Sequence, residues 1–211
     1  MIKKICEFKK FKYVLSLPDE YDKNKKYPVF LFLHGAGSRG NNIDALKDGQ
    51  FLSSIDKLEL EVITVQPQCY ADTWFEIFEQ LIEFTKFIQN KEYTDITRYY
   101  LFGVSMGGYA SWQLGMTLPK TFAAMIPICG GGMYWNAEKL KDTKIWAFHG
   151  SVDSVVYPEE SEKMVNAINQ HGGDARLTIY EGVAHPAWEK VYSDKTVFEW
   201  CLAQKIKPIE W

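Results

Sequence analysis

Six short runs of apolar residues, separated by helical patterns, constrain this fold more than any other feature of the sequence. The runs are continuous, as expected for strands covered on both faces, and they span 28–34, 61–66, 98–104, 122–129, 144–150 and 175–182. Helical patterns lie between or after them, at 73–90, 105–118, 158–172 and 191–204. This alternation predicts a doubly wound, mainly parallel sheet of the α/β class.

The first segment, 6–18, departs from the alternation. It is rich in lysine, which protects the edge of a sheet from pairing with other chains. We expect it to add an antiparallel strand or hairpin at one edge. The sequence contains no linker, repeat or low-complexity tract. Its 211 residues fit one compact domain, so residues 1–211 are predicted to form a single α/β unit.

Composition excludes several classes of function. A formal net charge of −3 provides no basic field for nucleic acid. No apolar run approaches the roughly 18 residues that span a bilayer, and the N-terminus lacks a secretory pattern. The four cysteines, which show no CxxC pair, are expected to be reduced thiols. A cytoplasmic protein that contacts neither nucleic acid nor membrane is therefore expected, and the sequence does not indicate its oligomeric state.

The pattern Gly-x-Ser-x-Gly occurs at 103–107, between a predicted strand and a predicted helix. A serine at the tip of such a tight turn projects its hydroxyl outward, and flanking glycines avoid clashes with the neighbouring strand and helix. The helix N-terminus also favours developing negative charge. We therefore predict that Ser105 is a nucleophile. The alternative is a glycine-rich turn that only helps the helix to pack.

A second glycine-containing motif, Leu-His-Gly-Ala-Gly at 33–37, follows the first long buried run. An oxyanion hole needs two converging backbone N–H groups, one from the residue after the nucleophile and one from an earlier loop. These positions predict Met106 and Ala36 as the two donors. His34 is expected to orient the loop by hydrogen bonding.

A catalytic acid is expected at the end of a later strand, and Asp153 lies just beyond the run at 144–150. The rival carboxylates precede a strand, follow a helix end or lie in the late helix, positions that suit solvated charges; they are Asp142, Asp174 and Asp194. His149 is expected to support the loop of Asp153.

A catalytic base is expected in the loop after the last strand, where His185 lies. The rival is His171, which ends a predicted helix beside two glycines, a place typical of solvated or capping histidines. Metal catalysis is the other use of histidine. The four histidines, at 34, 149, 171 and 185, show no HxH or HExxH spacing. We therefore expect neither a metal nor another cofactor.

With these motifs in order, the chain resembles the α/β-hydrolase superfamily. The shared segments are LHGAG at 33–37, GVSMGG at 103–108, HGSVDSVV at 149–156 and the Ala-His pair at 184–185. More narrowly, it looks like small carboxylesterases grouped with dienelactone hydrolases, feruloyl-type esterases and prolyl-oligopeptidase-like hydrolases. The resemblance implies Ser105, Asp153 and His185 as a catalytic triad, and Ala36 and Met106 as oxyanion donors.

The expected substrate follows from the segment after the strand at 122–129. Only residues 130–143 separate this strand from the next, which leaves no room for a lid domain. An open site favours soluble short-acyl or aryl esters, with cinnamoyl or acetyl-sugar esters among them. Four aromatic residues follow strand ends and are expected to form a wall of the substrate pocket: Trp74, Tyr134, Trp135 and Trp188. Peptidase or acyltransferase activity with the same triad, or a non-catalytic binding role, stays open.

Overall fold

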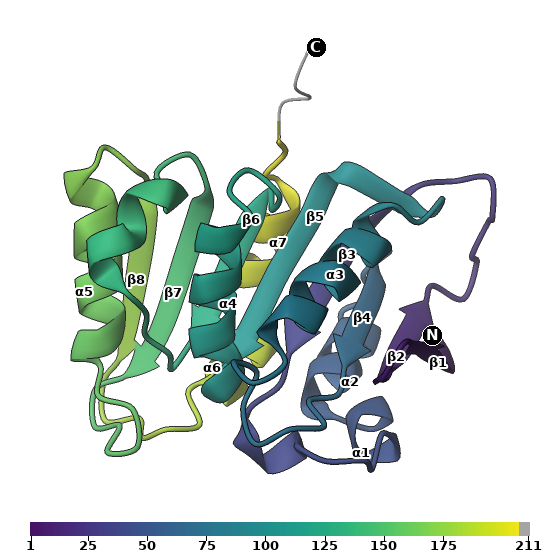
Figure 1. The fold of residues 1–211 in the computed structure, drawn as a ribbon, viewed down its shortest axis with the longest axis horizontal. Helices are drawn as coiled ribbons and strands as arrows, with labels where there is room; N and C mark the ends of the chain where they lie inside the picture. The colour runs from purple at the N-terminus through teal and green to yellow at the C-terminus, as the bar shows by residue number, and fades with distance from the viewer. Residues whose placement is uncertain (207–211) are drawn as a thin grey trace.

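An eight-stranded sheet forms the centre of the computed structural model, which describes residues 1–206 (Figure 1). The sheet order is β1-β2-β4-β3-β5-β6-β7-β8. The strands are β1 (Ile2–Phe8), β2 (Phe11–Leu17), β3 (Tyr27–Leu33), β4 (Ile63–Pro67), β5 (Thr94–Val104), β6 (Ala124–Ile128), β7 (Lys144–Gly150) and β8 (Ala175–Tyr180). All neighbours from β4 to β8 are parallel. The predicted mainly parallel α/β-hydrolase fold is confirmed.

The expected edge hairpin is also present. β1 pairs antiparallel with β2 from Ile2 opposite Leu17 to Phe8 opposite Phe11, and β2 pairs antiparallel with β4. β1 begins earlier than the sequence pattern predicted, because its residues alternate between exposed and half-buried positions and form no apolar run. Residues of β1 are therefore only partly covered, as suits an outer strand.

Helices cover both faces of the sheet, as they must when both faces are apolar. One face carries α3 (Phe78–Gln89), α4 (Met106–Thr117) and α5 (Glu159–Gln170), which stand in front of the strands in Figure 1. The other face carries α2 (Gln50–Lys57), α6 (Trp188–Ser193) and α7 (Lys195–Leu202). The short α1 (Asp44–Lys47) precedes α2, and two 3-10 turns, η1 (Ala36–Ser38) and η2 (Tyr134–Leu140), complete the elements.

Two predicted helices differ from the structure. Residues 73–77 form turns, because the Glu76 carboxylate accepts a hydrogen bond from the Thr73 backbone N–H at 3.1 Å, and the helix begins only at Phe78. The predicted helix at 191–204 is divided into α6 and α7. Asp194 causes the break, since its carboxylate accepts from the Thr196 N–H at 2.9 Å and caps a new helix.

Helices α1 and α2 were not predicted. The segment between β3 and β4 has no long apolar run, and α2 buries only one stripe of side chains: Phe51, Leu52 and Ile55. The sequence pattern therefore assigns no helix or strand to residues 35–60, between the runs at 28–34 and 61–66. These helices form one side of the pocket beside Ser105.

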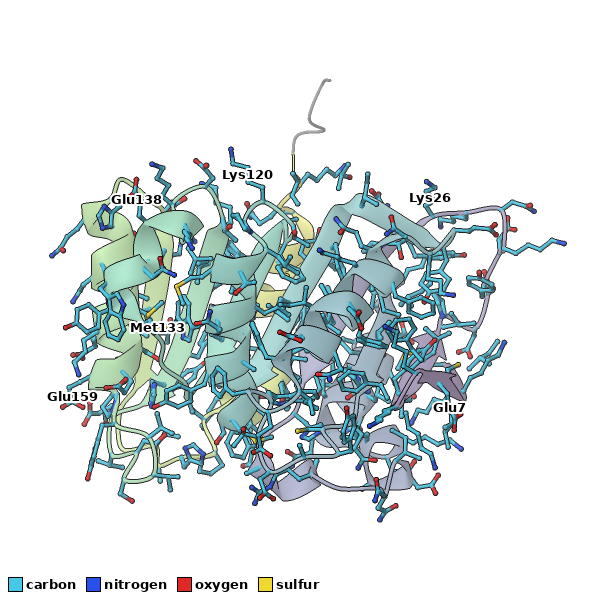
Figure 2. All side chains as sticks on the ribbon, in the orientation of Figure 1. Glu7, Lys26, Lys120, Met133, Glu138 and Glu159 are labelled. Carbon is cyan, nitrogen blue, oxygen red and sulfur yellow. The ribbon has the colours of Figure 1, made fainter. Side chains whose placement is uncertain are left out.

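The segment after β6 carries no lid. It contains only the 3-10 turn η2 before β7 begins at Lys144. Lys26, Lys120 and Glu138, labelled at the top of Figure 2, precede β3, β6 and β7 and lie at the end of the sheet where these strands begin. Among residues 1–206, no helix combines the length and apolar character that crossing a bilayer requires.

The aromatic layer beneath α7 offers a test of the packing. The Phe198 ring is fully buried and lies within 6.4 Å, between centroids, of Phe30, Phe51 and Phe102. Phe198→Ala is expected to lower the free energy of unfolding by about 3–5 kcal/mol, because it leaves a cavity. The control Ile96→Ala, at a side chain that is 54% exposed, should change it by less than about 0.5 kcal/mol. Urea denaturation measures both, and equal effects would contradict the assigned packing.

Candidate active site

Ser105 lies at a strained turn between β5 and α4. Its backbone has a φ of +53°, a region that non-glycine residues rarely occupy. The turn is possible because two glycines let the backbone approach closely: a Cβ on Gly103 would lie 2.2 Å from the Gly107 oxygen, and one on Gly107 would lie 2.0 Å from the Leu33 oxygen. The Ser105 N–H donates to the Ile128 oxygen at 2.9 Å, which fixes the turn against β6. Strain of this kind is typical of functional sites.

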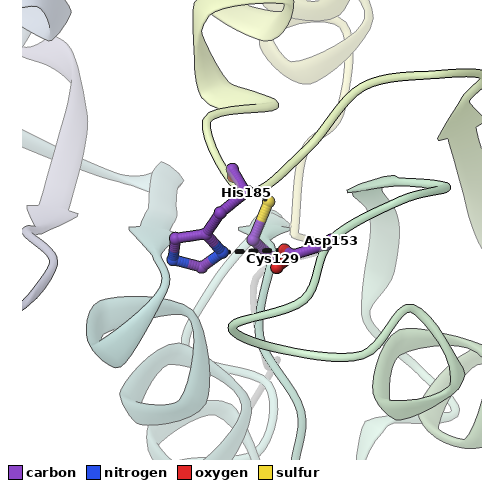
Figure 3. Close-up of side chains that lie close together, drawn as sticks. All are labelled: Cys129, Asp153 and His185. Carbon is purple, nitrogen blue, oxygen red and sulfur yellow. Dashed lines mark hydrogen bonds and ion pairs between the residues drawn. The ribbon is translucent and has the colours of Figure 1, made fainter.

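The structure brings Ser105, Asp153 and His185 together. The Ser105 Oγ lies 2.8 Å from His185 Nε2, and the Asp153 Oδ2 lies 2.7 Å from His185 Nδ1. Figure 3 shows the second of these contacts. Asp153 is buried and His185 is partly exposed, so the carboxylate is shielded while the imidazole faces the pocket. Such an arrangement lets a histidine take a proton from a serine hydroxyl.

The acid loop holds the Asp153 carboxylate as an ion. Burial alone would raise its pKa, but hydrogen bonds from His185 and from the backbone N–H groups of Val156 and Val155 outweigh burial and lower it. His149 supports the same loop, as expected: its Nε2 lies 2.9 Å from the Val156 oxygen and 3.2 Å from Asp153 Oδ2.

The loops of the acid and the base are packed against each other. A Cβ on Gly150 would lie 2.2 Å from the Val183 oxygen, and the Val152 N–H donates to that same oxygen at 3.1 Å. This close approach explains why glycine follows His149 at the end of β7. It also fixes the distance between Asp153 and His185, which belong to two different loops.

The rival residues lie elsewhere. Two of the carboxylates form exposed ion pairs, Asp142 with Lys120 and Asp174 with Lys144, and Asp194 caps α7. His171 is exposed at the C-terminal end of α5.

The two predicted oxyanion donors each begin a helical turn. Met106 is the first residue of α4 and Ala36 is the first residue of η1. The first N–H groups of a helix have no acceptor within it, so both are available for a ligand. A Cβ on Gly35 would lie 3.4 Å from the Ser105 Cβ, which shows how closely this loop approaches the nucleophile. The Arg39 side chain holds the loop by donating to the Ala36 oxygen and to the Asp72 oxygen.

His34 and Trp74 tie this loop to the segment after β4. The Cys69 N–H donates to His34 Nε2 at 2.9 Å, and His34 Nδ1 lies 2.7 Å from the Gly35 oxygen. The Trp74 indole N–H donates to the His34 oxygen at 3.0 Å. The assignment of Trp74 to the pocket wall was wrong, because its side chain is fully buried beneath the loop. Sequence reasoning missed this role, since only the fold brings residues 34 and 74 together.

Cys129, Asp153 and His185 form a cluster whose ligand atoms lie within 4.8 Å of one another (Figure 3). The arrangement does not suit a metal. Burial raises the pKa of the Cys129 thiol to about 12, and this thiol donates to the His185 oxygen at 3.0 Å. The His185 Nδ1 is already bonded to Asp153. Cys129 therefore holds the base loop against β6, and all four cysteines are free thiols, as predicted.

A pocket of about 440 Å³ opens beside Ser105. Trp188 lines it, with a ring 5.3 Å from that of His185. Tyr134 and Trp135, expected in the same wall, are exposed on η2 and do not line this pocket. The helices α1 and α2, which the sequence did not predict, form the other side of this pocket. This side is lined by Ala45, Leu46, Gly49, Gln50 and Phe51.

Comparison with known proteins agrees with this geometry. The sequence model of the dienelactone hydrolase family matches residues 13–194. A thermostable esterase superposes with a TM-score of 0.84 at 30% identity, over 97% of this chain and 63% of its own. The esterase Est1E from Butyrivibrio proteoclasticus has a TM-score of 0.73 at 15% identity, covering 95% and 97% of the two chains, which shows a shared fold. Endo-1,4-beta-xylanase Y of Acetivibrio thermocellus is 29% identical over 61% of this chain, which spans only 14% of the xylanase.

His34 predicts a pH-dependent stability. Burial lowers its pKa to about 4, against 6.5 for an ordinary histidine. Between these values the unfolded chain binds a proton that the folded protein does not, so stability falls as pH drops from 6.5 towards 4, by about 3 kcal/mol. His34→Gln, which keeps an acceptor for the Cys69 N–H, should remove this component. Asp153 does not interfere, because its lowered pKa costs stability only below its ordinary value of 3.8. Urea denaturation at pH 7, 5.5 and 4.5 measures the difference, and an identical pH dependence in both proteins would refute it.

Proposed function

We propose that this chain, which belongs to the dienelactone hydrolase family, is a carboxylesterase-type hydrolase that cleaves carboxylic esters through Ser105, Asp153 and His185. The observation that supports the proposal most is the continuous hydrogen-bonded line from Asp153 Oδ2 through His185 to the Ser105 Oγ, with contacts of 2.7 and 2.8 Å. Each residue then has one chemical task, set by its position in this line.

Acylation begins at the serine. His185 Nε2 takes the proton of the Ser105 hydroxyl as the oxygen attacks the ester carbonyl carbon. Asp153 accepts a hydrogen bond from His185 Nδ1 throughout, which keeps the imidazole in the required tautomer and stabilises the imidazolium. The protonated Nε2 then gives its proton to the departing alcohol, which leaves an acyl group on Ser105.

The carbonyl oxygen carries negative charge in the tetrahedral intermediate. The backbone N–H groups of Met106 and Ala36 would bind this oxygen, and the N-terminus of α4 adds a favourable dipole. Deacylation repeats the same steps with water, which His185 activates. The acid is released and Ser105 is regenerated.

The proposed substrates are soluble esters with small acyl or aryl-acyl groups. A volume of about 440 Å³ is within the range of pockets that bind small organic molecules, roughly 300–1,000 Å³. Among the structural neighbours, one is described as a ferulic acid esterase, and Est1E has been solved with ferulic acid bound. We propose that aryl-acyl esters of this size fit the pocket of this chain. We also propose that the protein acts on a small-molecule substrate and binds neither nucleic acid nor a membrane.

Ser105→Ala is expected to lower kcat for 4-nitrophenyl acetate by roughly 10⁴–10⁶-fold, because the nucleophile is lost. The melting temperature should stay the same or rise, since alanine removes only the hydroxyl. Release of 4-nitrophenolate measures the rate. A fluorophosphonate probe, located by peptide mass spectrometry, should label Ser105 in the unmodified protein.

The control is Ser193→Ala, an exposed serine whose hydroxyl donates only to the backbone of its own helix. It should keep full activity and full labelling. Residual activity near the unmodified level in Ser105→Ala, or labelling of another serine, would contradict the proposed mechanism. Hydrolysis of dipeptide anilides at rates above those of esters would indicate a peptidase instead.

Removal of metal ions is expected to leave the activity unchanged. The proposed mechanism uses no metal, and the Cys129 thiol stays protonated in the pH range of the assay because its pKa is about 12. Dialysis against EDTA, followed by the 4-nitrophenyl acetate assay, measures this. Loss of activity that zinc restores would show that the cluster of Cys129, Asp153 and His185 binds a metal.

A further inference from the structure

Gln66 is a polar residue at the inner wall of the pocket, and it has no partner for its side-chain nitrogen. It lies near the end of β4, its side chain is 1% exposed, and it lines the pocket beside Ser105. Within the described part of the chain, its Nε2 is buried without any hydrogen-bond acceptor. Buried amide groups are nearly always hydrogen-bonded, so an acceptor is expected to occupy the adjoining space.

Several of the side chains around Gln66 are apolar. In the sheet, Thr64 is paired with Phe30, so Gln66 and Phe32, each two residues further on, lie on the same face. This face is covered by α2, and the neighbouring pocket walls are Phe32, Leu46 and Phe51. An amide among apolar side chains can select between ligands. A ligand that cannot hydrogen-bond to the amide leaves it unpaired and therefore binds less tightly.

Two hydroxyls on the same face of the sheet as Gln66 are also without partners among the described residues. Thr64 Oγ1 and Ser16 Oγ are buried and unpaired among the described residues, and these two residues are opposite each other in β4 and β2. They do not line the pocket. Among the described residues, Gln68 Oε1 is likewise buried without a partner, so neither it nor the two hydroxyls pairs with Gln66 Nε2. The pocket, which Gln66 lines, is then the side from which we take an acceptor to come.

The position of β4 assigns Gln66 to the acyl side of the substrate. His185 protonates the departing alcohol, so the alcohol lies beside His185 and the acyl group on the other side of Ser105. In the sheet, β4 lies beyond β3 on one side of β5, whereas β7 and β8, which carry the acid and base loops, lie on the opposite side. The part of the pocket that leads to Gln66 is therefore the part that receives the acyl group.

We propose that Gln66 is a specificity-determining residue that selects acyl groups bearing a hydrogen-bonding oxygen, such as a hydroxyl, at the end remote from the ester. The oxygen accepts a hydrogen bond from Gln66 Nε2, while the apolar walls hold the chain or ring between the two polar ends. This inference rests on the proposed ester hydrolysis at Ser105 and adds the chemical class of acyl group to it.

The test compares matched pairs of methyl esters that differ by one hydroxyl: 3-phenylpropanoate with its 3-hydroxyphenyl and 4-hydroxyphenyl analogues, and hexanoate with 6-hydroxyhexanoate. We expect the unmodified protein to give a higher kcat/KM for at least one hydroxylated ester than for its plain partner. Gln66→Met, which keeps the volume and removes the amide, should reduce that ratio by roughly ten- to a hundredfold.

Thr64→Val is the matched control, because it removes a buried unpaired hydroxyl next to Gln66 that does not reach the pocket. It should leave the ratio unchanged. The melting temperature of Gln66→Met should not fall, since the substitution removes an unpaired polar group from an apolar layer. If Gln66 only stabilised the fold, for example through a bound water, Gln66→Met would lower the melting temperature and would affect both esters equally, which overturns the proposal.

A measurement on the unmodified protein covers the case in which Gln66→Met does not fold. The free hydroxylated acids should inhibit 4-nitrophenyl acetate hydrolysis at roughly tenfold lower concentration than the plain acids. Equal inhibition by the hydroxylated and the plain acids would refute the role of Gln66. The proposed function would still stand in that case, provided that hydrolysis of 4-nitrophenyl acetate is lost in Ser105→Ala. If instead hydrolysis of 4-nitrophenyl acetate persists in Ser105→Ala, the proposed function itself fails.

Discussion

The contact on which the site depends is the approach of α4 to the end of β3. A single Cβ on Gly107 would lie 2.0 Å from the Leu33 oxygen, so the helix and the strand can meet only without a side chain there. This approach keeps the backbone of Ser105 at a φ of +53° and directs its hydroxyl towards His185. It also places the loop after β3 beside the nucleophile. One close contact thus sets both the nucleophile and one wall of the expected oxyanion hole.

The remaining parts of the site are fixed by contacts between loops. Glycine at position 150 allows the acid loop to touch the base loop, and the Cys129 thiol ties the base loop to β6. On the other side, His34 and Trp74 join the loop after β3 to the segment after β4. A triad assembled from separate strand ends needs such connections, because a shift of about 1 Å between its members reduces catalysis substantially.

The sequence predicted those features that depend on local pattern. Continuous apolar runs identified the six central strands, and glycine spacing around Ser105, with Asp153 and His185 after later strands, identified three residues that the structure brings together. It did not predict contacts between distant segments. The indole of Trp74 is satisfied by a backbone oxygen 40 residues away, so its position after a strand end suggested the pocket, whereas the fold buries it.

The same limit explains why one side of the pocket was not predicted. The length of the segment after β6 correctly predicts that no lid follows this strand, but one side of the pocket is formed by α1 and α2. These helices are short and bury only a narrow stripe of side chains, so the sequence pattern does not reveal them. Gln66 could not be recognised either, because a glutamine near the end of a buried strand is informative only when its partners are known. Among the described residues, the buried unpaired polar groups include those of Ser16, Thr64 and Gln66, which lie on the same face of the sheet. Only the last of them reaches the pocket, which is why substrate selection is assigned to that residue and not to the layer as a whole.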